Sequence, residues 1–397
     1  MESMLMIART TNKENDMLTV ALTGRIDSGN AAEAERQIME AAAGFSGKLI
    51  LDAEALEYIS SAGLRVILRL KKANPQVRIV NASSEVYEIF DMTGFTEMMD
   101  ISKAYRKLSI DGCEVIGEGA NGKVYRIDAD TIVKVYKNHD ALEEIHNERE
   151  LARKAFVMGV PTAIPYDVVQ VGDLYGSVFE LLNAKSFAKL MIADPDNTDE
   201  YARQSVDILK TIHSTILKPG ELPDKKAEAL IWAEFCQDYL PKDVGDKLVR
   251  LVREVPDTLN MLHGDYHIKN IMQQNGENLL IDMDTLSMGH PVFEFAAIYL
   301  AYVGFSCIDH ENVKRFLGIP YEQAQLFWKA TLKYYFNTED EAVWQAIEDK
   351  AAIIGYARVL RRTFRKAKED EDYKARLVEY CKTALCELVP RTDTLSF

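Results

Sequence analysis

The chain has 397 residues, of which 47% are hydrophobic and 27% charged, with 21 Gly and 11 Pro. This composition excludes a wholly disordered or fibrous protein, and at ~150 residues per domain the length predicts two or three domains. The formal net charge of −15 makes nucleic acid and anionic membranes poor partners, because both call for a basic face on the protein.

The first hundred residues alternate between strand and helix patterns. Residues 17–24 are rich in β-branched and apolar residues and end at a glycine, as a strand does. Residues 31–43 carry apolar side chains at helical spacing. The alternation continues with strands at 48–53 and 76–81 and with helices at 63–70 and 86–91. It predicts an α/β layer in which helices cover one face of a sheet.

A junction between a strand and a helix, LEYISSAGLRVILRLKK, holds two adjacent serines. Ser60 or Ser61 can cap this helix with its hydroxyl, and serine is among the preferred cap residues. A helix N-terminus also favours a phosphate, because its free N–H groups and dipole attract negative charge. The spacing alone favours the capping role.

Residues 1–107 resemble a STAS domain, the fold of bacterial anti-sigma-factor antagonists. The segments that carry the resemblance are, in order, GRIDSGNA, ISSAGLRVIL and IFDMTGFTEMMDI. It implies a mixed sheet with helices on one face and a function in docking on a protein partner. It also implies a phosphoacceptor serine two residues before the Gly-Leu pair, which is Ser61. The family often has Asp just before that serine, whereas this chain has Ser60.

The pattern changes near residue 107, and GEGANGKVY follows, which reads G-x-G-x-x-G-x-V. A Rossmann loop has similar spacing but leads directly into a helix, whereas two strand patterns follow here. A glycine loop between antiparallel strands is typical of kinases, where it covers nucleotide phosphates. Gly117, Gly119 and Gly122 are therefore candidate nucleotide-binding residues, because any Cβ would hold the backbone away from the phosphates.

The strand pattern TIVKVYK places Lys134 among apolar neighbours, where a lysine is costly unless it is paired. In kinases such a lysine contacts the α- and β-phosphates and a helix glutamate. The predicted helix 146–156 supplies Glu148 on its inward face. Its neighbours Glu144 and Glu150 are not excluded by the spacing.

In the segment LHGDYHIKNIM, His263, Asp265 and Asn270 have the spacing of a kinase catalytic loop. A carboxylate there can meet an acceptor hydroxyl, and an amide five positions later can reach a metal. Asp282 falls at a strand end in LLIDMD, where a kinase holds its Mg²⁺-binding Asp. Because a lone Asp in a turn is usually a cap, the order and spacing of the whole set carry the prediction.

Residues 108–303 resemble the aminoglycoside phosphotransferase and choline kinase group, because HGD and IDMD are the forms typical of that group. The resemblance implies a bilobal α+β domain at 108–397 with a protein-kinase-like fold, an N-lobe at about 108–182 and a C-lobe at about 183–397. VFELL is hinge-like, and its Glu180 and Leu182 are further candidates for nucleotide binding.

The resemblance also implies ATP, with GTP as an alternative, and Mg²⁺ as cofactors and a small-molecule hydroxyl as acceptor. Asp265 would orient that hydroxyl and take its proton, Asn270 and Asp282 would hold Mg²⁺, and Lys134 would hold the α- and β-phosphates. Asp284 is a further acidic group in the same segment.

Two features beside these motifs are expected to be structural, and one departure from the family pattern, at Glu294, is expected to matter little. His263 is expected to brace its loop. Glu294 in GHPVFEF takes the place of an Asp that the family often has. The basic stretch RVLRRTFRKAK, residues 358–368, is expected to be a solvated helix face, because acidic residues follow it at once.

The remaining observations concern the compartment. Five cysteines, an odd number without CxxC spacing, argue against a disulfide framework and a zinc site. The segment MESMLMIAR lacks the features of a signal peptide, and the longest apolar stretch, 295–305, is shorter than the ~18 residues of a membrane helix. A cytoplasmic protein is therefore expected.

Three functions stay open at this stage. The first is a small-molecule kinase with a regulatory STAS domain. The second is a signalling protein whose STAS surface is the output and whose kinase half senses nucleotide. The third is a kinase half that phosphorylates Ser61 or a partner protein.

Overall fold

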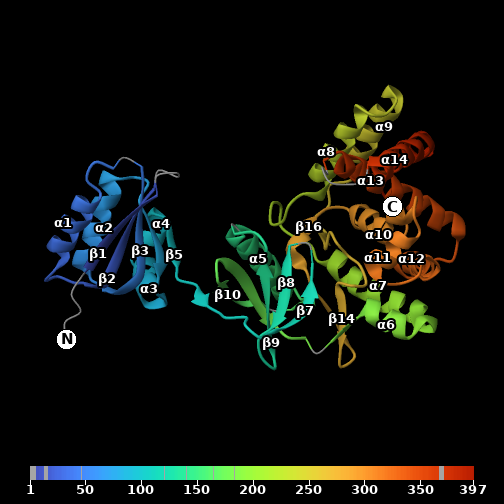
Figure 1. Cartoon of the computed structure of the whole chain (residues 1–397). Coiled ribbons are helices and arrows are strands. Elements are labelled where there is room, and N and C mark those ends of the chain that lie inside the picture. The colour runs from blue at the N-terminus through green and yellow to red at the C-terminus, as the bar shows by residue number, and fades with distance from the viewer. Residues whose placement is uncertain are drawn as a thin grey trace. The chain divides into compact units, whose positions relative to one another are not determined.

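The computed structural model describes residues 6–12, 17–45, 47–119, 121–139, 141–163, 165–182, 184–365 and 371–397. The chain divides into two compact units, which Figure 1 shows in colours that follow the sequence. The first unit is Met1–Ser109 with Val168–Asp173, and the second is Ile110–Asp167 with Leu174–Phe397. Among the helices in the described ranges, none is long and apolar enough to cross a membrane.

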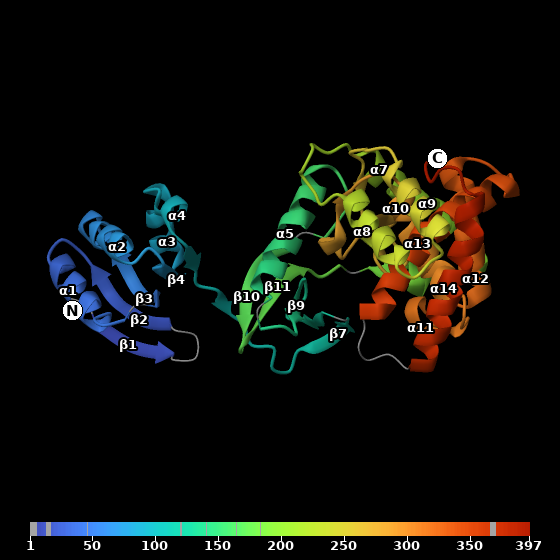
Figure 2. The ribbon, with the colours of Figure 1, turned by 90° about the horizontal axis from the view of Figure 1, so that it is seen from above.

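The first unit is a mixed sheet in the order β1-β2-β3-β4-β5. β1 runs antiparallel to β2, and the other neighbours are parallel. The helices lie on one side of the sheet (Figure 2), as the sequence predicts. The bounds are β1 (Met6–Asn12), β2 (Met17–Ile26), α1 (Ala31–Ala41), β3 (Lys48–Ile59), α2 (Ser61–Ala73), β4 (Arg78–Ala82), α3 (Ser84–Met92), α4 (Phe95–Met98), β5 (Ile101–Lys103) and β6 (Arg106–Lys107).

Buried and half-buried side chains alternate along β2, which explains why the helices cover only one face of the sheet. Leu18, Val20 and Leu22 point to one face and are fully buried, whereas the residues between them are only half-buried. β3 runs beyond the predicted end at residue 53 because its second half pairs with the end of β2, where Ile26 stands opposite Ile59. β1, which the sequence analysis did not predict, adds the antiparallel edge.

The second unit begins with the strand-rich N-lobe of a kinase-like fold. Its strands follow the order β11-β9-β8-β7, and the helix α5 packs against β11, whereas only residues 165–167 of β10 belong to this unit. The predicted glycine loop therefore joins two antiparallel strands. The bounds are β7 (Glu114–Glu118), β8 (Gly122–Arg126), β9 (Thr131–Tyr136), α5 (Leu142–Val157), β10 (Pro165–Val171) and β11 (Leu174–Glu180).

The C-lobe is mainly helical, so the predicted bilobal α+β class is confirmed. Its short strands flank the HGD segment, with β14 paired to β15 and β13 paired to β16. The bounds are β12 (Lys185–Ser186), α6 (Phe187–Ala193), α7 (Thr198–Ser214), α8 (Lys225–Gln237), α9 (Lys242–Arg253), β13 (Met261–Leu262), β14 (Ile271–Gln274), β15 (Glu277–Leu280), β16 (Ser287–Met288), α10 (Val292–Tyr302), α11 (Glu311–Leu317), α12 (Tyr321–Phe336), α13 (Glu341–Arg365) and α14 (Glu371–Arg391), with single 3₁₀ turns at Pro195–Asn197, Met283–Thr285 and Gly304–Ser306.

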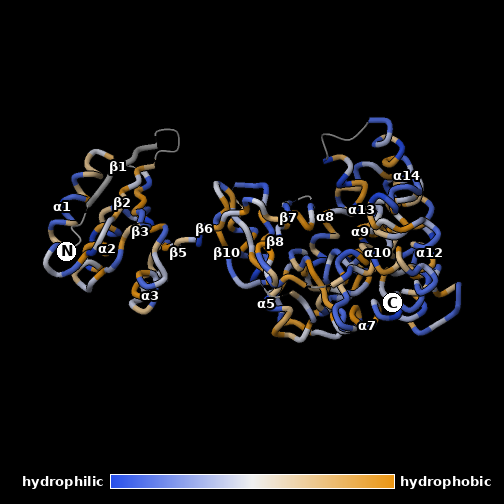
Figure 3. Tube along the Cα trace, turned by 60° about the horizontal axis from the view of Figure 1, so that its bottom comes forward, coloured by the Kyte–Doolittle hydropathy of each residue, from blue (hydrophilic) through white to orange (hydrophobic). Residues whose placement is uncertain are grey.

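The core of the C-lobe surrounds α10, which lies in the longest apolar stretch of the sequence. This helix is buried on nearly all sides, as expected for a helix that is apolar all round. Phe295 packs against Trp328 of α12, and Tyr299 donates or accepts a 2.8 Å hydrogen bond with Tyr356 of α13. Figure 3 shows hydrophobic stretches running through the interior of the unit and hydrophilic stretches on its outer helices.

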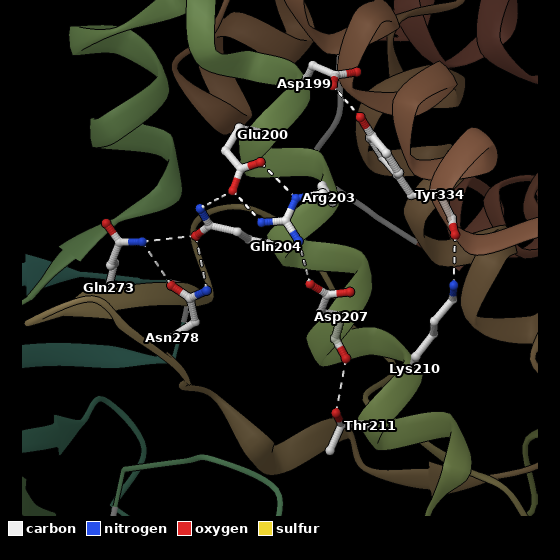
Figure 4. Close-up of polar contacts among 10 residues, drawn as sticks. All are labelled: Asp199, Glu200, Arg203, Gln204, Asp207, Lys210, Thr211, Gln273, Asn278 and Tyr334. Carbon is white, nitrogen blue, oxygen red and sulfur yellow. Dashed lines mark hydrogen bonds and ion pairs between the residues drawn. The ribbon is translucent and has the colours of Figure 1, made fainter. Parts of the chain in front are cut away.

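A polar face of α7 ties this helix to its neighbours (Figure 4). The Gln204 side-chain oxygen accepts hydrogen bonds from Gln273 of β14 at 3.0 Å and from Asn278 of β15 at 3.2 Å. Lys210 donates to the backbone oxygen of Tyr334 of α12 at 2.8 Å. These bonds fix the β14–β15 hairpin, which follows directly on the HGD segment, against the helical core.

Candidate active site

The glycines of the hairpin between β7 and β8 have two different roles, close packing against β9 and open space for a ligand. A Cβ on Gly122 would lie 2.3 Å from the Val135 carbonyl oxygen, so packing against β9 requires glycine there. A Cβ on Gly119 would meet nothing within 4 Å among the described residues, and one on Gly117 would make only ordinary contact. The Gly119 N–H donates to the Gly122 carbonyl at 2.9 Å and closes the turn. The open space at Gly119 leaves its backbone free for close approach by a ligand.

Lys134 on β9 lies at the centre of the site, and its ammonium group bonds two carboxylates. Its Nζ lies 2.9 Å from Glu148 Oε1 and 3.2 Å from Asp282 Oδ1. The side chains of Lys134 and Glu148 are 17% and 5% exposed, so α5 and β9 share a buried ion pair. Burial lowers the pKa of Lys134, but the charges of Glu148 and Asp282 raise it more, so the net pKa lies above its usual value. The predicted partner is therefore Glu148, and the ammonium stays charged at neutral pH.

Tyr136, two residues further along β9, also donates to Glu148 through its hydroxyl. The tyrosine is fully buried, and burial together with the Glu148 charge raises its pKa. Its hydroxyl therefore stays protonated and holds the carboxylate towards Lys134. Glu144, which the spacing left open, instead accepts from Asn121 at 3.3 Å. Glu150 pairs with Lys154 at 2.9 Å on an exposed part of α5.

The HGD loop is braced by a buried glutamate. Glu294 on α10, only 1% exposed, accepts from the backbone N–H groups of His263 and Gly264 through its carboxylate. Gly264 has φ +85°, and a Cβ there would meet the Thr285 carbonyl oxygen at 2.4 Å. This crowding gives a physical reason for glycine between His263 and Asp265. The two hydrogen bonds to the backbone show that Glu294 holds the shape of the loop.

His263 braces the same loop, in agreement with the prediction. It is fully buried, and its Nδ1 accepts from the Asp265 backbone N–H at 3.3 Å. Its carbonyl oxygen accepts from the Thr285 hydroxyl at 2.7 Å. Burial lowers the pKa of His263, so the neutral ring acts as an acceptor rather than as a charge.

The Asp265 carboxylate is half exposed and lies 3.4 Å from His267 Nε2. Burial raises the pKa of Asp265, but the hydrogen bond and charge of His267 outweigh it, so the net pKa lies below its usual value. Asp265 is therefore an ionised acceptor at neutral pH. A carboxylate held in this state can orient a hydroxyl and accept its proton.

Asn270 and Asp282 are brought together by the backbone. The Ile281 N–H donates to the Asn270 carbonyl at 3.0 Å, which places the residue before Asp282 against Asn270. The Asn270 Nδ2 donates to the Asp265 carbonyl at 3.0 Å, so its Oδ1 remains available as an acceptor. Asp282 adopts φ +66°, a conformation that aspartate tolerates better than most residues, and its side chain is 45% exposed.

This donor set fits Mg²⁺, which prefers oxygen ligands. Mg²⁺ is usually bound through one or two carboxylates plus substrate phosphates and water, and the Asp282 carboxylate and Asn270 amide oxygen are ligands of this kind. In the part of the chain that is described, no group of three His, Cys, Asp or Glu residues is arranged to hold a metal. Asp284 is half-buried nearby, and burial together with the Asp282 charge raises its pKa to about 7.

Two predicted site residues, Glu180 and Leu182, lie at or just beyond the end of the strand next to β9. Glu180 ends β11 opposite Thr131 of β9, and Leu182 follows that strand. Between them, the Leu181 N–H donates to the Asp130 carbonyl at 2.7 Å. No hydrogen bond or ion pair in the described ranges joins Glu180 or Leu182 to Lys134. Their contact with a nucleotide stays a prediction.

Ser61 and Ser60 have separate positions at the start of α2. The Ser60 hydroxyl accepts from the Gly63 N–H at 3.3 Å and is the N-cap, whereas Ser61 is the first helical residue. Ser61 is exposed. The capping role that the spacing favours therefore belongs to Ser60.

A family model described as the phosphotransferase enzyme family matches residues 112–327, more than half of the chain. The chain belongs to this family. The match covers the glycine hairpin, the Lys134–Glu148 pair, the HGD loop and Asp282, so the second unit is a phosphotransferase domain.

The first unit is a STAS domain, since the model of that domain matches residues 8–108. Over 99 residues, the chain is 31% identical to BtrV of Bordetella bronchiseptica, whose name describes it as an anti-sigma factor antagonist. That alignment covers 24% of this chain and 85% of BtrV.

Several solved structures of aminoglycoside phosphotransferases are similar to the chain. APH(4)-Ia is 12% identical, with 70% of this chain and 93% of that chain covered and a TM-score of 0.48. ADP-bound APH(2'')-Ib is 15% identical, with 76% and 98% covered and a TM-score of 0.47. The gentamicin complex of APH(2'')-IIa is 15% identical, with 80% and 99% covered and a TM-score of 0.46.

Proposed function

We propose that the phosphotransferase domain transfers the γ-phosphoryl group of ATP to a hydroxyl of a small molecule, with Mg²⁺ as cofactor. The observation that carries the proposal is the contact of one half-buried ammonium group, Lys134, with both Glu148 and Asp282. A lysine is held in this way when it must stay charged beside nucleotide phosphates and beside a metal ligand. GTP is the alternative donor.

Each residue of the site has a role that its geometry supports. Lys134, fixed by Glu148, contacts the α- and β-phosphates, and the hairpin at Gly119 covers them. Asp265 orients the acceptor hydroxyl and accepts its proton. Asp282 and Asn270 hold Mg²⁺, which when bound neutralises charge on the phosphates. Because such catalysis consists mainly of positioning and charge neutralisation, the loop brace from Glu294 supports the reaction from outside the site.

The substitution Asp265→Asn tests this proposal. The variant is expected to lose transfer by at least ~100-fold, because the group that accepts the proton is gone, while it still binds nucleotide. The matched control is Asp246→Asn, which alters an exposed carboxylate that accepts from Gln237 at 3.0 Å. Normal turnover by Asp265→Asn would remove Asp265 from the mechanism.

The STAS domain is proposed to regulate the enzyme or to bind a protein partner, and Ser61 supports a second candidate function. Its hydroxyl is exposed at a helix N-terminus, and Ser60 leaves it free of the capping role. We therefore propose Ser61 as a phosphoacceptor, either of this kinase or of another. Incubation with Mg-ATP followed by intact mass measurement should show one added phosphate in the wild type and Ser60→Ala but not in Ser61→Ala. An unchanged wild-type mass at full nucleotide occupancy would eliminate autophosphorylation.

A further inference from the structure

His267 stands two residues after Asp265 in the HGD loop and is almost completely buried, with 6% of the residue exposed. Its Nε2 lies 3.4 Å from Asp265 Oδ2, on a carboxylate that is half exposed. The other described contacts of Asp265 use its backbone, and none involves the second carboxylate oxygen, Oδ1. A buried ring therefore contacts one oxygen of the proposed catalytic carboxylate and leaves the second one open.

The buried surroundings of His267 determine which ring nitrogen carries the hydrogen. Its Nδ1 is enclosed and has no hydrogen-bond partner among the described residues. A hydrogen on Nδ1 would be a buried donor without an acceptor, which is rarer in proteins than an acceptor without a donor. A neutral imidazole has one N–H group, so its hydrogen belongs on Nε2, where it faces the Asp265 carboxylate. His267 is thus a hydrogen-bond donor to Asp265.

The backbone and the ring of His267 are both held by neighbouring elements. The N–H of the next residue, Ile268, donates to the Tyr302 hydroxyl at 3.0 Å. The His267 carbonyl accepts from the Asn270 N–H at 2.9 Å. The ring packs edge-on against Phe316 of α11, with 5.1 Å between the ring centres and 90° between the ring planes. This support fixes the direction of the Nε2–H group before any substrate binds.

Phe316 is itself tied to the HGD loop. Lys269 donates through its Nζ to the Phe316 carbonyl at 3.2 Å, so the backbone and the ring of one residue of α11 both meet the loop. Phe316 remains 37% exposed and therefore contributes less to the core than a fully buried phenylalanine does. Its effect on the histidine ring can for this reason be tested apart from its effect on stability.

We infer that His267 is a positioning residue for phosphoryl transfer: its Nε2–H group holds Oδ2 of Asp265, leaves Oδ1 for the acceptor hydroxyl, and is itself kept in place by Phe316. The inference rests on the proposed function, since it adds a residue to the same site. A half-exposed carboxylate rotates about its side-chain bonds unless a partner fixes it. Because proton transfer requires hydrogen-bond reach between hydroxyl and carboxylate, loss of this partner lowers the rate even though Asp265 remains.

The test compares the steady-state kinetics of the full chain and its variants, with Mg-ATP as donor and glycerol and water as acceptors. His267→Ala is expected to lower kcat by about 10- to 100-fold, the range of a hydrogen bond to a charged group. KM for Mg-ATP should not change, because the described contacts of the His267 side chain include no residue proposed to hold the nucleotide. His267→Gln, whose amide N–H can donate in place of Nε2, should recover part of the loss.

Substitution of Phe316 gives a second arm of the same test. Phe316→Ala should lower kcat by a smaller factor than His267→Ala, because the histidine ring loses its support but keeps its donor. In the double variant, kcat should equal that of His267→Ala alone, because Phe316 acts through His267. Two losses that multiply in the double variant would contradict this coupling.

The matched control is His310→Ala, which removes an exposed imidazole from the other end of α11, where it stacks on Tyr321 at 3.9 Å between ring centres. This control should leave kcat unchanged, and thermal unfolding of every variant separates a loss of rate from a loss of fold. An unchanged kcat in His267→Ala, or an equal loss in His310→Ala, would overturn the inference. A loss in His267→Ala that appears in KM for Mg-ATP instead of in kcat would do the same.

If neither probe accepts a phosphoryl group, nitrogen NMR of the histidine rings decides. In the chain bound to Mg²⁺ and AMP-PNP, the His267 ring, identified by the loss of its signals in His267→Gln, should carry hydrogen on Nε2. The Nε2 resonance should shift in Asp265→Asn and stay unchanged in Asp246→Asn. Hydrogen on Nδ1 alone, or no shift in Asp265→Asn, would refute the contact on which the inference depends.

The two proposals fail in different ways. Absence of Mg-AMP-PNP binding by the wild type would refute the proposed function itself. Binding of Mg-AMP-PNP together with a kcat that does not depend on His267 would refute only the positioning role.

Discussion

The buried carboxylate of Glu294 provides a quantitative test of how the catalytic loop is held. In Glu294→Gln, the single amide oxygen can accept from only one of the two backbone N–H groups, those of His263 and Gly264, that the carboxylate serves. The other N–H then faces the new amide NH₂, which is itself a donor. The substitution also removes the charge from the remaining hydrogen bond. One unsatisfied buried donor costs about 1–3 kcal/mol, and the lost charge about 1 kcal/mol more, so the free energy of unfolding should fall by about 2–4 kcal/mol.

Differential scanning calorimetry of the full chain measures this loss. At about 2–4 °C per kcal/mol for a large domain, Tm of the phosphotransferase domain should fall by about 4–16 °C. Turnover should fall as well, because Asp265 follows directly on the loop that Glu294 holds. The control is Glu234→Gln, which disrupts an exposed pair with Arg253 at 4.0 Å and should cost less than about 1 kcal/mol.

The pH dependence of Tm gives an independent check on the role of Glu294. Burial raises the pKa of Glu294, but His213 and the loop N–H groups lower it more, so the net pKa in the folded state lies below 4.5. A carboxylate with a lowered folded pKa contributes stability above its unfolded pKa and loses it as the pH falls through the folded value. The gap in Tm between wild type and Glu294→Gln should therefore be constant at neutral pH and narrow below about pH 4.5. Equal Tm values for Glu294→Gln and Glu234→Gln would refute the reasoning.

Three further predictions concern other parts of the phosphotransferase domain. Lys134→Met should reduce transfer by at least ~100-fold in a steady-state assay, because no cation then meets the phosphates, and wild-type rates would contradict this role. Gly122→Ala should destabilise the domain by more than about 1 kcal/mol in thermal unfolding, because its Cβ would clash with a strand carbonyl. Gly119→Ala should not destabilise the domain but should weaken nucleotide binding in calorimetric titration. A destabilised Gly119→Ala variant, or a Gly122→Ala variant of unchanged stability, would contradict the roles given to these two glycines. Burial raises the pKa of Glu348, so the folded state binds its proton more tightly and this group reduces stability as the pH rises above 4.5. Glu348→Gln, which can still accept from the Trp328 indole, should therefore raise Tm more at pH 8 than at pH 4. An equal change in Tm at both pH values would contradict a raised pKa of Glu348.

The residues that the sequence predicts best are those whose spacing is read along one strand or loop. Lys134 and Glu148 follow from an apolar strand and a helical period, and the structure joins them at 2.9 Å. Asp265 and Asn270 lie on one loop, where the Asn270 side chain donates to the Asp265 carbonyl at 3.0 Å, so their spacing alone brings them together. The α/β layer of the first unit follows in the same way from alternating strands and helices, except for the antiparallel edge strand β1.

The residues that the sequence does not predict depend on packing between distant elements. Glu294 braces the HGD loop from a helix that begins about 30 residues later, and no local pattern specifies that contact. Arg358 of the basic stretch is half-buried, with its guanidinium 5.6 Å from the centre of the Trp232 ring on α8, whereas the sequence predicts a solvated face. This position depends on how α13 packs on α8, and a run of basic residues followed by acidic ones gives no sign of it. Helical periodicity indicates which face of a helix is apolar, but not which side chains meet it.

The central claim is that Lys134, Asn270 and Asp282 form a working site for a Mg²⁺-bound nucleotide, and thermal stabilisation by ATP tests it most directly. The full chain is heated with ATP, with and without Mg²⁺, beside the variant Asp282→Asn. At 100 times the dissociation constant, a ligand that binds only the folded state adds about 2.7 kcal/mol, which is readily measured. The account predicts a stabilisation that requires Mg²⁺ and is lost in Asp282→Asn. No stabilisation by ATP, or the same Mg²⁺-dependent stabilisation in the variant, would contradict it.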